Sequence, residues 1–72
     1  MAVMCIRARR EAVGLTQRDV ATGMGVVIGA VANWESEVAL PKTREIPRLA
    51  RVLSCSISDL FEQEEVPEDS YD

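Results

Sequence analysis

Apolar residues recur at helical spacing along most of the chain, and glycines or prolines separate the periodic segments. The pattern predicts helices over about residues 3–13, 16–24, 27–35 and 43–53, and a short fifth helix that Ser56 caps. We therefore expect a compact all-α fold of five short helices with no sheet.

The apolar faces of these helices define the expected core. With one Trp, one Tyr and one Phe in 72 residues, that core must be largely aliphatic. The apolar positions at helical spacing are Ile6 and Val13, then Val20, Ala21 and Met24, then Val31 and Trp34, then Ile46, Leu49, Ala50 and Leu53, and finally Ile57, Leu60 and Phe61. A chain of this length has room for one such core and therefore for one domain.

Local signals mark where the helices begin and end. Gly14 and Gly25 are natural C-terminal stops, because a residue without a β-carbon adopts positive φ at little cost. Thr16, with Asp19 three residues later, approximates a capping box, and Ser56 begins a second example of the same pattern.

Two short predicted helices that flank a tight glycine turn form a helix-turn-helix unit. Such a unit needs a small residue where its helices cross, a glycine at the turn and an apolar residue that locks the second helix. These requirements fall on Ala21, Gly25 and Val31, and Val20 and Trp34 complete the apolar wedge. The chain matches the unit in spacing as well as in residue type.

The sequence resembles the Xre/Cro family of phage-repressor-like domains. The stretches that carry the resemblance are RREAVGLTQ at residues 9–17, NWE at 33–35, EIPRLA at 45–50 and SISDLF at 56–61. Because the likeness covers about residues 4–62, it implies a five-helix, lambda-repressor-like DNA-binding domain over nearly the whole chain.

The resemblance also implies roles for individual residues. In this family the N-terminal part of the second helix of the unit enters the major groove of DNA. The implied base-reading residues are Gln17, Val27, Ile28, Gly29, Ala30 and Asn33. The implied contacts to the sugar-phosphate backbone come from Gln17, Asn33, Ser36, Lys42 and Arg44. The Gln and Asn amides offer the paired donor and acceptor that suit adenine edges or phosphates.

The resemblance further implies an ion pair between Arg10 and Glu35. An arginine on the first helix of similar domains pairs with the acid that ends the recognition helix, and removal of one partner strands a charge. The alternative is that Arg10 is a free phosphate ligand. Arg7 and Arg9 either contact phosphate or form a solvated helix face.

The sequence departs from the family pattern where DNA specificity should be encoded. Val27, Ile28, Gly29 and Ala30 offer almost no hydrogen-bonding capacity. Val27 and Ile28 could touch thymine methyl groups, but an apolar surface equally suits weak discrimination or a protein partner. Gly23 and Gly29 lie inside predicted helices, where each costs up to about 1 kcal/mol relative to Ala. The sequence offers no reason for either glycine.

The net charge of −4 divides unevenly along the chain. Residues 62–72 carry six acids and no base, whereas residues 1–61 carry eight bases and six acids, a net of +2. We expect residues 1–62 to form the DNA-binding domain and residues 63–72 to form an acidic, disordered tail. The tail either only aids solubility or competes electrostatically with DNA.

Composition argues against several other classes of protein. The chain has no histidine, and Cys5 and Cys55 are too few ligands for a metal site, so we expect no metal, cofactor or enzymatic activity. We expect both cysteines to be free, partly buried thiols, although one disulfide is possible. The N-terminus carries no signal peptide or membrane span, which favours the cytoplasm of a bacterium, with the protein bacterial or phage-encoded.

The function predicted from the sequence is sequence-specific binding of double-stranded DNA by an Xre/Cro-type transcriptional regulator, a repressor. We expect a homodimer on a pseudo-palindromic site, and no membrane or small-molecule substrate. The alternative is a protein-interaction or antitoxin-like accessory module, which would bind a protein through the apolar surface of residues 27–35.

Overall fold

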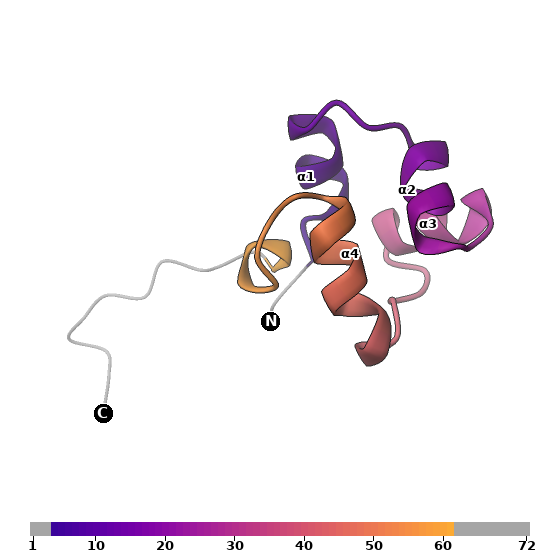
Figure 1. Ribbon diagram of the computed structural model, residues 1–72. Coiled ribbons are helices and arrows are strands. Elements are labelled where there is room, and N and C mark those ends of the chain that lie inside the picture. The colour runs from indigo at the N-terminus through magenta and orange to yellow at the C-terminus, as the bar shows by residue number, and fades with distance from the viewer. Residues whose placement is uncertain (1–3, 62–72) are drawn as a thin grey trace.

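The protein is all-helical over residues 4–61, the part of the chain that the computed structural model describes. The elements in order are α1 (Ile6–Ala12), α2 (Gln17–Met24), α3 (Ile28–Glu35), the 3₁₀-helix η1 (Thr43–Glu45), α4 (Ile46–Val52) and the 3₁₀-helix η2 (Ser58–Leu60) (Figure 1). The expected all-α fold is confirmed. The expected count of five helices is not, because the described residues form four α-helices and the predicted fifth is the 3₁₀-helix η2.

The first helix is shorter than predicted because its leading residues pair with the other end of the fold. Met4 forms an isolated antiparallel bridge with Phe61, and the Cys5 N–H donates to the Leu60 carbonyl. Met4 is therefore paired with Phe61 and not part of the helix, and α1 begins at Ile6 with Cys5 as its N-cap. The bridge holds the two ends of the described chain together.

The predicted helix boundaries around α2 are confirmed. Gly14 and Gly25 have φ of 75° and 70°, in the left-handed region that favours glycine. At the start of α2 the Asp19 N–H donates to Thr16 Oγ1 at 3.1 Å, and the Thr16 N–H donates to Asp19 Oδ2 at 2.9 Å. The bond that the carboxylate accepts from the Thr16 N–H lowers the pKa of Asp19, and the Thr16 side chain adds to this effect.

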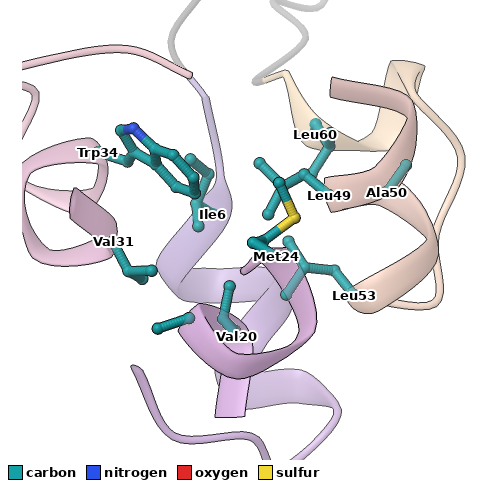
Figure 2. Close-up of a cluster of buried hydrophobic side chains, with 10 residues drawn as sticks. Ile6, Val20, Met24, Val31, Trp34, Leu49, Ala50, Leu53 and Leu60 are labelled. Carbon is teal, nitrogen blue, oxygen red and sulfur yellow. The ribbon is translucent and has the colours of Figure 1, made fainter. Parts of the chain in front are cut away.

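The core lies where the helices converge, with α2 packed against both α3 and α4 (Figure 2). Its buried residues are Ile6, Val20, Ala21, Met24, Val31, Trp34, Leu49, Ala50, Leu53 and Leu60. Two predicted positions are wrong, since Val13 is 42% and Ile57 47% exposed. Both lie just outside regular helix, Val13 as the C-cap of α1 and Ile57 as the N-cap of η2, so neither follows the helical face that the spacing assumed.

The crossing of α2 and α4 explains the glycine inside α2. A β-carbon added at Gly23 would lie 3.1 Å from Cγ2 of Val52, closer than side chains normally pack. Gly29 in α3 differs, because an added β-carbon there meets nothing within 4 Å. Gly23 therefore serves packing, and Gly29 does not.

Arg9 fastens α1 to η2. Its Nε donates to the Asp59 carbonyl at 3.1 Å, and its Nη2 lies 3.6 Å from Asp59 Oδ1. Arg7 instead pairs with Glu11 on the exposed side of α1, with Nε 3.2 Å from Oε1. Both arginines are thus engaged within the fold.

Candidate nucleic-acid interface

A tight turn joins α2 to α3. The N–H of Gly25 donates to the Thr22 carbonyl at 3.3 Å, and the N–H of Val26 donates to the Ala21 carbonyl at 3.0 Å. Val26 also packs against the core, after which α3 begins at the N-cap Val27. The turn is therefore held by backbone hydrogen bonds and by an apolar contact, so the two helices form one rigid unit.

One side of α3 is fixed in the core. Val31 and Trp34 are buried, and Ala30 is half-buried against the same cluster. The spacing of the three residues places them along one face of the helix. Ala30 was predicted to read bases, but the structure places its methyl group against the core.

The opposite side of α3 is exposed and almost entirely apolar. Val27 is 75% and Ile28 40% exposed, and Gly29 and Asn33 are also exposed. Gly29 and Asn33 are four residues apart and therefore lie one turn apart on the same face. Ala32 lies four residues after Ile28 and is half-buried, so it is at the border of this face. Ala32 was not among the predicted site residues, although it lies four residues after Ile28.

Gln17 is half-buried at the start of α2 and reaches to the end of α3. Its Nε2 donates to Glu35 Oε1 at 3.2 Å. An amide carries two N–H donors and one carbonyl acceptor, so this bond leaves one donor and the carbonyl oxygen for another partner. The contact fixes the side chain that the resemblance assigns to DNA.

Glu35 also accepts a bidentate pair of hydrogen bonds from Arg10. The Nε of Arg10 lies 2.7 Å from Oε2 of Glu35, and its Nη2 lies 3.2 Å from Oε1. The side chains are only 14% and 6% exposed, and Arg10 Nη1 donates further to the Leu15 carbonyl at 2.9 Å. The Arg10 guanidinium thus ties α1 to the end of α3 and to the loop before α2, and does not act as a free phosphate ligand.

The environment of Glu35 favours its ionised form. Burial alone would raise its pKa, but hydrogen bonds from Arg10 and Gln17 and the charges of Arg10 and Arg7 outweigh burial and lower it. The hydrogen bond to Glu35 correspondingly raises the pKa of Arg10. Within residues 4–61 no buried side-chain nitrogen or oxygen lacks a hydrogen-bond partner, so the buried atoms of Arg10 and Glu35 are all paired.

The residues implicated in backbone contacts follow the recognition helix. Ser36 is the C-cap of α3, Lys42 is the N-cap of η1 and Arg44 lies inside η1, and all three are exposed. The Asn33 carbonyl accepts from the N–H of Val38 at 3.0 Å, which holds the intervening loop to the end of α3. The Ser36 hydroxyl donates to the Asn33 carbonyl at 3.4 Å, whereas the side chains of Lys42 and Arg44 are exposed cations that could meet phosphate oxygens.

Other kinds of site find little support in the part of the chain described. Residues 4–61 contain no group of three or more His, Cys, Asp or Glu side chains that could hold a metal ion. No helix in this range is long and apolar enough to cross a bilayer. Cys5 and Cys55 are free and half-buried, and burial raises the pKa of the Cys55 thiol.

Comparisons with known proteins agree with this geometry. No curated protein matches the sequence. Among solved structures, the chain is similar to the P22 c2 repressor protein, crystallised in complex with synthetic operator 9T in the presence of Tl⁺. The two share 31% identity with a TM-score of 0.70, over 76% of this chain and 83% of that one. A helix-turn-helix family model matches residues 6–60, which is most of the chain, and the protein therefore belongs to the helix-turn-helix family of the Xre/Cro type.

Proposed function

We propose that the protein represses transcription by binding operator DNA, with the exposed face of α3 in the major groove. The family match and the 31% identity to a repressor solved with its operator support the broader statement, that it is a sequence-specific DNA-binding regulator of transcription. Its family and fold are those of DNA-binding regulators and not of enzymes. The observation that carries the proposal is that, within residues 4–61, α3 is buried along one side and has exposed side chains at its N-terminal end.

Base contacts in this proposal come from Val27, Ile28, Gly29 and Asn33, with Gln17 beside them. Ala30 contributes less because it packs against the core. Contacts to the sugar-phosphate backbone come from Gln17, Asn33, Ser36, Lys42 and Arg44. The cations supply the part of the affinity that does not depend on sequence, since each neutralised phosphate releases counterions.

A salt series on a DNA duplex recovered from a random-sequence pool tests the proposal. The logarithm of the affinity should fall linearly with the logarithm of salt concentration, and Lys42→Ala or Arg44→Ala should each reduce the slope by about 1. Arg51→Ala is the matched control, because Arg51 is an exposed cation in the last turn of α4 and should leave the slope unchanged. If no duplex is recovered or bound at low salt, the proposal fails.

The same experiment addresses the alternative function. The exposed apolar side chains of Val27 and Ile28 also suit a protein-interaction or antitoxin-like module. Such a module would form a complex with a protein that resists salt, and it would show no measurable affinity for duplex DNA.

We further propose that the protein binds DNA as a homodimer in the cytoplasm of a bacterium. A single module of this size buries little DNA surface, and two-fold pairing on half-sites about one helical turn apart raises the affinity. Sedimentation of the complex should give two chains on a duplex with both half-sites and one chain when one half-site is scrambled.

Residues 63–72, together with Glu62, lie outside the described residues. We propose that this acidic stretch lowers non-specific DNA affinity, because residues 62–72 carry six acids and no base. Deletion of residues 63–72 should raise the affinity for an unrelated duplex at low salt. An unchanged affinity would mean that the segment has no electrostatic role.

A further inference from the structure

The leading end of α3 consists of three adjacent residues that lie outside the described hydrophobic core. We call Val27, Ile28 and Gly29 the apolar tip. Val27 is 75% and Ile28 40% exposed, and a β-carbon added at Gly29 would meet nothing within 4 Å. None of the three is among the buried residues of the core.

The apolar tip costs folding stability. Valine is a poor N-cap, and α3 has no side-chain cap, whereas Thr16 caps α2 with a capping box. Glycine inside a helix is less stable than alanine, and an added β-carbon at Gly29 would meet nothing within 4 Å, whereas one at Gly23 would lie 3.1 Å from Val52 Cγ2. A polar N-cap residue at position 27 and alanine at position 29 would make the helix more stable. The three residues therefore point to a ligand that is itself apolar at the contact.

The major groove offers one strongly apolar feature, the C5-methyl group of thymine. Valine and isoleucine have no donor or acceptor with which to read the other edges, and the missing side chain at Gly29 lets the helix backbone approach the bases closely. Asn33 lies one turn further along the same face and carries the donor and acceptor that match adenine.

From this arrangement we propose that the apolar tip recognises thymine methyl groups, so that the preferred half-site contains thymines beside an adenine read by Asn33. The inference rests on the proposed function, since it presumes that α3 enters the major groove. Recognition of this kind differs from base recognition by hydrogen bonds, because the affinity depends on methyl groups that carry no polar atom.

Replacement of thymine by deoxyuridine tests this directly, because it removes the methyl group and preserves base pairing. In a duplex selected from a random pool, single replacements should weaken binding about fourfold at the positions under the tip, as expected for one buried methyl group. Replacement at other positions should have no effect. Conversely, 5-methylcytosine should bind better than cytosine where it restores the methyl group.

Protein variants assign the effect to the tip. Val27→Ala and Ile28→Ala should each reduce the thymine-over-deoxyuridine preference at one position toward unity. Val38→Ala is the matched control, since Val38 is also 75% exposed but follows α3 in the loop, and it should keep the full preference. Val27→Ser should raise the melting temperature by supplying the missing cap and still lose the preference.

The outcomes separate this inference from the proposed function. If the protein binds its selected duplex but no thymine is sensitive to deoxyuridine, the methyl proposal is wrong and DNA binding stands. The methyl proposal would also be wrong if Val27→Ala reduced the affinity for thymine and deoxyuridine duplexes by the same factor. If no duplex is bound at low salt, the proposed function itself fails, and a protein partner on the apolar tip is the remaining explanation.

Discussion

The two ends of α3 differ in how firmly their side chains are held by the rest of the fold. The C-terminal end is held by Trp34 in the core and by the nearly buried pair of Glu35 and Arg10. The N-terminal end, Val27 and Ile28, is apolar, exposed and uncapped. A helix anchored at one end and free at the other can carry a reading surface without loss of its position. The contrast divides α3 into a last turn that is anchored in the fold and a first turn whose side chains remain exposed.

The largest expected effect comes from breaking the anchored end. Arg10→Met leaves the buried carboxylate of Glu35 without its cation and should lower the free energy of unfolding by about 3–5 kcal/mol. Val27→Ala at the free end should change it by less than about 0.5 kcal/mol. Urea denaturation followed by Trp34 fluorescence measures both.

A second variant shows whether the stranded charge causes that loss. Because Arg10→Met with Glu35→Leu removes both charges, the double variant should recover much of the stability lost in the single one. The structural role of the pair would be contradicted if Arg10→Met lowered DNA affinity and left the unfolding midpoint unchanged.

Acid should weaken the anchored end through the same carboxylate. The pKa of Glu35 is lower in the folded protein than its ordinary value of 4.5, so its ionised form stabilises the fold above that pH. This contribution is lost as the pH falls through the depressed folded value. The unfolding free energy should therefore decline below about pH 4.5, with Asp19 and Asp59, whose pKa values are also lowered, adding to the decline.

In Arg10→Met the pH dependence of the Glu35 contribution should reverse. Without the guanidinium, burial becomes the dominant influence and raises the pKa of Glu35, so that protonation now relieves a buried charge. The variant should approach wild-type stability as the pH falls, while the contributions of Asp19 and Asp59 remain. A constant stability difference between pH 7 and pH 3 would exclude the pair as the origin of the effect.

Much of the anchored end could be predicted from the sequence, because repeating patterns encode it. Helical spacing identified Val31 and Trp34 as buried, and the family resemblance implied the pairing of Arg10 with Glu35. The bond from Gln17 to Glu35 could not be predicted, since it depends on how two helices meet across the turn.

Other features of the fold arise from long-range contacts that leave no periodic signal. The bridge from Met4 to Phe61 shortens α1, and the tether from Arg9 to Asp59 joins segments far apart in the sequence. At the free end, the sequence correctly showed that residues 27–30 lack hydrogen-bonding groups. The resemblance implied that Ala30 reads bases, although Ala30 lies four residues before the buried Trp34 and packs against the core.

The smallest expected effect separates the two glycines that looked alike in the sequence. Gly29→Ala should stabilise the protein by up to about 1 kcal/mol, because the new methyl group enters open space and the helix gains propensity. Gly23→Ala gains the same propensity but places a β-carbon 3.1 Å from Val52 Cγ2, so its net benefit should be smaller or negative. Thermal unfolding resolves the difference, since 1 kcal/mol shifts the midpoint of a domain this small by about 4–8 °C.

We expect the same two glycine variants to affect DNA affinity in the opposite order to stability. If Gly29 is there to let α3 approach the bases closely, Gly29→Ala should weaken binding to the selected duplex while it stabilises the fold. Gly23→Ala should leave the affinity of the folded protein unchanged, because Gly23 faces α4 and not the exposed side of α3. A Gly29→Ala variant that is more stable and binds DNA with unchanged affinity would show that a side chain at this position does not hinder binding. The binding end of α3 would then consist of Val27 and Ile28, without Gly29.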